Sequence, residues 1–212
     1  MIAAISNKMI DLRSDTITKP CDRMLDFMLH AKVGDDVYGE DLTVKELEDK
    51  IANFFGMESA MFFPSGTMAN QTAIKIHTNP GDQVIAHEYS HVYNYEGGGA
   101  SFNSGVSFKL LQGQKGIFNP DQLKYAINPK NFFHSPLTKL VSLENTTNKG
   151  GGHCWDVKHF EEIKFICDEN GLGLHMDGAR VWNSIVAKDN NPKIYGNHFD
   201  TISVCLSKGL GC

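Results

Sequence analysis

The fold is indicated most clearly by the stretch Leu172-Gly173-Leu174-His175-Met176-Asp177-Gly178-Ala179-Arg180. Its first five residues form a mostly apolar run, which is typical of a strand covered on both faces. Three further runs have the same character, at residues 83–86, 140–143 and 201–206. Helical patterns lie between these runs. The alternation predicts an α/β fold, a three-layer α/β/α arrangement with a mostly parallel sheet.

Capping residues mark the expected helix boundaries. Thr43-Val44-Lys45-Glu46 has the pattern of a capping box, and Gly56 is the expected end of that helix. Further helices are expected at residues 68–77, from Asn119-Pro120 onward, and between an Asp156 cap and Gly171.

The bulk composition excludes several classes of protein. With a net charge of -5 and no run rich in lysine or arginine, the chain offers no basic surface to nucleic acid. No apolar segment reaches the roughly 18 residues of a membrane helix, and no signal peptide is evident. The five cysteines are scattered without a C-x-x-C pair. We therefore expect reduced thiols and a cytoplasmic protein.

Ligands of parallel α/β sheets collect at the carboxyl ends of the strands. The residues that follow the apolar runs include Ser65-Gly66-Thr67, Asp177, Arg180 and Lys208. Taken singly, each has a structural explanation: a turn, a helix cap or a charge in solvent. Together they fit pyridoxal phosphate, whose phosphate needs a helix N-terminus and whose ring nitrogen needs a carboxylate. Its aldehyde needs a lysine amine, and an arginine would bind a substrate carboxylate.

Six motifs, in order along the chain, carry a family resemblance. They are residues 10–16 (IDLRSDT), 34–41 (GDDVYGED), 63–70 (FPSGTMAN), 142–146 (SLENT), 175–180 (HMDGAR) and 206–211 (LSKGLG). The chain thereby resembles the low-specificity L-threonine aldolases, which are pyridoxal-phosphate enzymes of the aspartate-aminotransferase-like fold type I. The resemblance runs from Met9 to the last residue.

The resemblance implies roles for the cofactor-binding residues. Lys208 matches the lysine that forms the Schiff base, and Asp177 matches the partner of the pyridine nitrogen. Ser65-Gly66-Thr67 matches the phosphate loop. His91 matches the histidine that stacks on the cofactor ring, and Arg180 is counted among the residues at the cofactor.

Other matches concern the substrate. Ser14 and Arg180 match residues that bind the substrate carboxylate. His134 matches a histidine near the substrate hydroxyl, which makes it the candidate base; the catalytic set is then Lys208, His134 and His91. No His/Cys/Asp spacing matches a metal site.

The resemblance further implies retro-aldol cleavage of L-threonine or L-allo-threonine to glycine and acetaldehyde, in a dimer of dimers. Residues 1–20 are expected to form an arm that contributes to the site, and 21–212 a large cofactor-binding domain. The family's chains continue past the lysine into a small C-terminal domain, whereas this sequence ends at Cys212. We therefore expect an incomplete chain with weak activity alone. The alternatives are a non-catalytic cofactor-binding fragment, a β-eliminating lyase or a transaminase.

Overall fold

The computed structural model describes residues 10–212, which divide into two units. One unit consists of the described residues up to Ala31 together with Leu206–Cys212, and it contains helix α1 (Asp22–Leu29). Within this unit the Thr18 hydroxyl donates to the carbonyl of Lys208 at 2.6 Å. The other unit is Lys32–Cys205.

The second unit is built on a sheet whose neighbouring strands are all parallel, in the order β2-β1-β3-β4-β5. The strands are β1 (Gln83–His87), β2 (Ser107–Leu111), β3 (Thr138–Glu144), β4 (Gly173–Gly178) and β5 (Thr201–Val204). Their register pairs Glu144 with Asp177, and Asp177 with Ser203. The carboxyl ends of β3, β4 and β5 therefore meet at one edge, and the predicted parallel α/β fold is confirmed.

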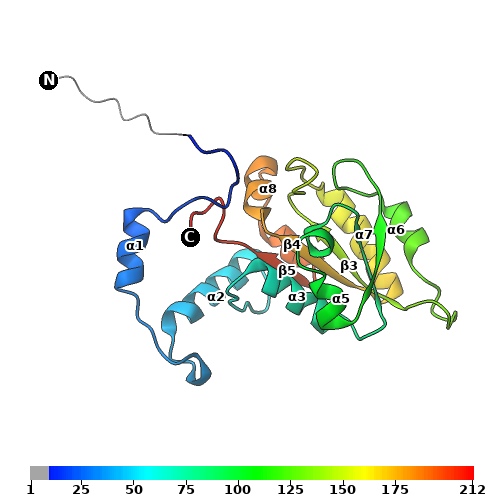
Figure 1. The fold of residues 1–212 in the computed structure, drawn as a ribbon, viewed down its shortest axis with the longest axis horizontal. Coiled ribbons are helices and arrows are strands. Elements are labelled where there is room, and N and C mark those ends of the chain that lie inside the picture. Colours follow the sequence, from blue (N-terminus) through cyan, green and yellow to red (C-terminus); the bar gives the residue numbers. More distant parts are fainter. Residues whose placement is uncertain (1–9) are drawn as a thin grey trace. The chain divides into compact units, whose positions relative to one another are not determined.

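Helices cover both faces of this sheet (Figure 1). The larger core includes side chains of α2, α6, α7, α8 and α9, whereas the smaller core on the other face includes side chains of α3, α4 and α5. The helices are η1 (Asp36–Tyr38, 3-10), α2 (Leu42–Phe55), α3 (Gly66–His77), α4 (His91–Asn94), α5 (Gly99–Ser104), α6 (Pro120–Ala126), α7 (Val157–Asn170), α8 (Val181–Lys188) and α9 (Lys193–His198).

Strand β4 has one apolar and one polar face. Leu174 and Met176 are fully buried in the larger core. Because successive side chains of a strand alternate, His175 and Asp177 point to the opposite face. There both of them contact the side chain of Asn70 from α3. The polar residues of the strand thus lie between the sheet and α3.

The four predicted strands are present, but one predicted cap is wrong and one strand was not predicted. Thr43 does not cap α2; the carboxylate of Asp41 accepts the N–H of Val44 at 3.0 Å, and the Thr43 hydroxyl donates to Lys32 instead. The edge strand β2 was not predicted, because its residues alternate in burial and form no continuous apolar run. The apolar residues 61–64 belong to no strand.

Three of the remaining predicted helix boundaries follow the capping rules, and one does not. Asn119 begins α6 with a complete capping box, and Gly56 and Gly171 end their helices in the left-handed conformation. Asp156 precedes α7 but makes no side-chain cap; its carboxylate accepts from Lys188 at 2.7 Å. No helix within residues 10–212 has the length and apolar character needed to cross a membrane.

Candidate active site

Asp177 is the central residue of the candidate site. It lies near the carboxyl end of β4 and is 2% exposed. One carboxylate oxygen accepts the N–H of Ala179 at 3.1 Å, and the other accepts the side-chain N–H of Asn70 at 3.0 Å. Burial raises the pKa of Asp177, the Ala179 N–H lowers it, and the negative charge of Glu96 raises it. The structure therefore holds a buried carboxylate that favours a positively charged or protonated partner.

Glu96 is a second buried carboxylate beside Asp177. Its Oε1 accepts from Asn70 at 2.8 Å and contacts His91 Nδ1 at 3.0 Å, and its Oε2 accepts from Gln71 at 2.5 Å. The side-chain amide of Asn70 consequently donates to both Glu96 and Asp177. One amide group on α3 thus bridges two acids that come from different parts of the chain.

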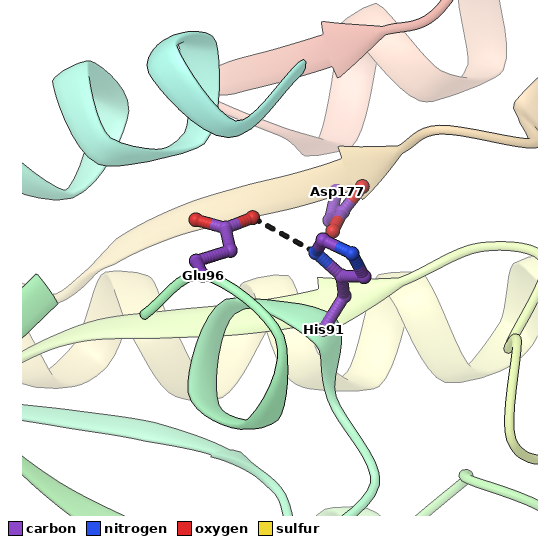
Figure 2. Close-up of side chains that lie close together, drawn as sticks. All are labelled: His91, Glu96 and Asp177. Atoms are coloured by element: carbon purple, nitrogen blue, oxygen red, sulfur yellow. Dashed lines mark hydrogen bonds and ion pairs between the residues drawn. The ribbon is translucent and has the colours of Figure 1, made fainter. Parts of the chain in front are cut away.

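His91 begins α4 and lies against these acids. Figure 2 shows its ring beside Glu96 and Asp177, and the ligand atoms of the three residues lie within 4.8 Å of one another. Its backbone N–H donates to Glu144 at 2.7 Å. The hydrogen bond with Glu96 raises the pKa of His91, while burial lowers it and the charge of Asp177 raises it. The imidazole is therefore biased toward its protonated form.

Glu144 adds a third acid at the end of β3. Burial raises its pKa, and so does the charge of Asp177. Its carboxylate accepts backbone N–H groups from His91 and Asn148, and so fixes two loops at this edge. Three acids thus surround one imidazole, an excess of negative charge that attracts a cationic group.

The N-terminus of α3 lies at the same end of the sheet as Asp177. Ser65 caps this helix by accepting the N–H of Met68 at 3.2 Å. A Cβ at Gly66 would lie only 2.7 Å from the sulfur of Cys205, so the backbone at Gly66 approaches the end of β5 too closely for a side chain. The first N–H groups of a helix bind anions, which suits Ser65-Gly66-Thr67 to a phosphate. The same helix carries Asn70 one turn further on.

Three more predicted residues, Arg180, Ser14 and Lys208, lie in different parts of the chain. Arg180 comes directly before α8, three residues after Asp177, and is partly exposed. Ser14 and Lys208 belong to the other unit, where Ser14 is exposed and its hydroxyl lies 2.7 Å from that of Thr16. Lys208 follows Val204, the last residue of β5, by four positions in the sequence.

His134 is not brought to this cluster within the chain. It is exposed, its ring lies 3.9 Å from that of Phe133, and it precedes the first residue of β3. Glu144 is at the other end of that strand, and seven strand residues span about 20 Å. The expected proximity of His134 to the other site residues is therefore not found in the single chain.

Sequence reasoning did not assign roles to Asn70, Gln71 or Glu96. Two features of the sequence pointed to a polar contact between α3 and β4. Asparagine is unfavourable inside helices, so Asn70 in the middle of α3 needed a reason to be there. His175 precedes Asp177 by two positions and therefore shares its face of the strand. Glu96 had no such signal, because the contact depends on how α4 and the loop after it fold back onto α3.

Comparison with known proteins places the chain in a family. The family model for beta-eliminating lyases matches residues 11–212. The chain belongs to the beta-eliminating lyase family. It is 39% identical over 214 residues to a probable low-specificity L-threonine aldolase of Arabidopsis thaliana, covering 100% of this chain and 60% of the relative. It is 40% identical over 204 residues to the low specificity L-threonine aldolase of Escherichia coli K12, covering 96% and 60%.

A solved structure of a threonine aldolase from Leishmania major has the same fold. It superimposes with a TM-score of 0.81 at 22% identity, over 92% of this chain and 57% of that chain. The chain thus spans about 60% of the length of the Arabidopsis and Escherichia coli relatives. The fold is that of type I pyridoxal-phosphate enzymes.

The cofactor of this family is pyridoxal phosphate. The described residues fit it. The buried, acid-rich pocket around Asp177 suits a protonated ring nitrogen, and the capped N-terminus of α3 suits a phosphate. Both features belong to two neighbouring elements, α3 and β4, which are joined through Asn70.

The Glu96 contact predicts how His91 titrates. The raised folded-state pKa of His91 means that this ion pair stabilises the fold fully below the unfolded pKa of about 6.5 and is lost as the pH rises through the folded pKa. In Glu96→Gln the pKa of His91 should fall, because its largest raising influence is gone. NMR titration of the imidazole measures this shift.

His87 provides the control within the same titration. Burial lowers the pKa of His87, and Glu96 is not among the groups that act on it. Its titration should be unchanged in Glu96→Gln. An unchanged pKa of His91, or an equal change at His87, would contradict the assigned ion pair.

Proposed function

We propose that this chain carries the cofactor-binding part of a pyridoxal-phosphate-dependent aldehyde-lyase that cleaves L-threonine or L-allo-threonine to glycine and acetaldehyde. The observation that carries the proposal is the buried Asp177, held between Asn70 and Ala179 beside His91. The names of the Arabidopsis and Escherichia coli relatives support the reaction and the substrate class.

Four groups of the chain would hold the cofactor. When bound, pyridoxal phosphate supplies an aldehyde that condenses with amines and a protonated ring that withdraws electrons from the α-carbon. Asp177 would hold the proton on the ring nitrogen, and Ser65-Gly66-Thr67 would bind the phosphate. His91 would lie against the ring, and Lys208 would supply the amine.

The substrate would be held by its carboxylate. Arg180 offers the planar fork of donors that suits a carboxylate, and Ser14 would add a hydroxyl. Two contacts on the carboxylate would fix rotation about the bond between the substrate nitrogen and the α-carbon, which sets the α-carbon bond that is aligned for cleavage. His134 would have to act from elsewhere than its place at the amino end of β3.

We also propose a cytoplasmic dimer of dimers. The cytoplasmic location is supported by the cysteines, because Cys21, Cys154, Cys167 and Cys212 are free thiols. The assembly is supported by the resemblance to threonine aldolases.

The role of Lys208 predicts a covalent label. Incubation with pyridoxal phosphate followed by borohydride should attach the cofactor to the peptide that contains Lys208, because a lysine amine condenses with the aldehyde. Lys208→Ala should lose the label, while Lys109→Ala, which removes an exposed lysine on the edge strand β2, should keep it. Mass spectrometry of the digested protein locates the label. Full labelling of Lys208→Ala would refute the assignment.

The reaction type predicts which products arise from L-threonine. Cleavage of the bond between the α- and β-carbons gives equal amounts of glycine and acetaldehyde, whereas β-elimination gives ammonia and a 2-oxo acid. We expect glycine and acetaldehyde. In Asp177→Ala the rate of acetaldehyde formation should fall at least about 100-fold, because removal of one electrostatic contact in an active site reaches that scale. Enzyme-coupled detection of acetaldehyde and chromatography of glycine measure both. Ammonia and 2-oxobutanoate as the main products would overturn the proposal.

A further inference from the structure

A chain of hydrogen bonds runs through the buried face between α3 and the sheet. His77 Nε2 lies 3.0 Å from the hydroxyl of Thr201, and this hydroxyl lies 2.9 Å from His175 Nδ1. His175 Nε2 lies 3.1 Å from Asn70 Oδ1. Asn70 then donates to Asp177 at 3.0 Å. His175 is fully buried, and nothing in the proposed reaction uses it directly.

The donor and acceptor roles in this row of hydrogen bonds follow from its Asn70 end. The amide nitrogen of Asn70 faces two carboxylates, Glu96 and Asp177, so it must be the donor to both. The oxygen of Asn70 therefore accepts, from His175 Nε2 and from the hydroxyl of Ser203 at 2.6 Å. His175 must carry its proton on Nε2.

The outer end is then fixed as well. With the proton on Nε2, the Nδ1 atom of His175 has a lone pair, which accepts from the hydroxyl of Thr201. That hydroxyl in turn accepts from His77 Nε2. Burial lowers the pKa of His175 to about 3, so the ring stays neutral and keeps this single arrangement.

The backbone leaves room for this chain to form. A Cβ at Gly173, the first residue of β4, would lie 2.7 Å from His77 Nδ1. The absence of a side chain lets the ring of His77 reach Thr201 across the start of the strand. From His77 through Thr201, His175 and Asn70, each donor therefore points toward the two acids.

We propose that His175 is a positioning residue for Asp177: it holds the side-chain amide of Asn70 in the one orientation that donates to both Asp177 and Glu96, and Thr201 selects its tautomer. The importance of Asp177 for a bound ring rests on the proposed function, whereas the direction of the chain does not. Without His175, the Asn70 oxygen keeps only Ser203, and the amide becomes free to turn its oxygen toward an acid.

Two pairs of variants separate positioning from packing. His175→Phe keeps a ring but removes the donor, whereas His175→Gln places an N–H group near the position of Nε2 and should rescue the contact. Thr201→Val removes the hydroxyl with almost no change of shape, and Thr201→Ser retains it. The second pair remains informative if the buried His175→Phe fails to fold.

The first measurement needs no cofactor. In the ¹⁵N-imidazole NMR spectrum of the unmodified chain at neutral pH, we expect His175 to be neutral with its proton on Nε2, and the Asn70 amide protons to be strongly shifted and protected. In Thr201→Val the Nδ1 resonance should move toward that of a nitrogen without a hydrogen bond, and in Thr201→Ser it should stay. A proton on Nδ1, or a doubly protonated ring, would overturn the proposal.

The second measurement uses pyridoxal phosphate itself. The dissociation constant should rise about 5- to 50-fold in His175→Phe and in Thr201→Val, the scale of a buried hydrogen-bonding group left unsatisfied, and less than about 3-fold in His175→Gln and Thr201→Ser. Equal affinities within each pair of folded variants would overturn the proposal. If the unmodified protein does not bind the cofactor, the proposed function fails. The NMR measurement alone then decides the direction of the hydrogen bonds.

Discussion

Two buried acids share one amide in this protein, and the rest of the site depends on that contact. Asp177 and Glu96 offer carboxylate oxygens within 4.8 Å of each other, and Asn70 donates to both. At that separation two full negative charges repel by about 3.5 kcal/mol in a protein with an effective dielectric constant near 20. A hydrogen bond to a charged group returns only about 1.5–3 kcal/mol. Asp177 accepts two such bonds, which together match the repulsion, so burial is the largest cause of its raised pKa.

This buried charge favours the binding of a cation. A protonated ring nitrogen beside Asp177 would offset the cost of burying its carboxylate charge. The proposed ligand would itself carry the positive charge beside Asp177, so the site would favour the protonated form of a bound pyridine. His91, biased toward its own protonated form by Glu96, keeps that second acid occupied. Because Glu96 is engaged by His91, a further proton or cation would bind at Asp177.

Helix α3 links this cluster to the rest of the pocket. Its N-terminus, capped by Ser65, offers backbone N–H groups to an anion, and its middle turn carries Asn70. A single helix and the strand beside it would thus bind a phosphate and a protonated nitrogen at opposite ends of one planar ligand. A shift of α3 along β4 would disturb both ends together.

Much of this was predictable from the sequence. The parallel sheet followed from four continuous apolar runs, and Asp177 was singled out because it follows one of these runs, at the strand ends where ligands of parallel sheets collect. The edge strand β2 was missed because one face of an edge strand is exposed and its pattern is weaker. Asp41 was missed as a cap because Thr43, with Glu46 three residues later, fits the capping-box pattern and Asp41 does not. The contacts of Glu96 and the distance of His134 depend on tertiary packing, which spacing along the chain does not encode.

The most direct test is the protonation state of the bound ring. Pyridoxal phosphate labelled with ¹⁵N at the ring nitrogen can be added to the unmodified chain and to Asp177→Ala, and its chemical shift and N–H coupling measured. The account predicts a protonated nitrogen with the unmodified chain at neutral pH and an unprotonated one with Asp177→Ala. A nitrogen that is unprotonated in the unmodified chain, or that stays protonated in Asp177→Ala, would contradict it.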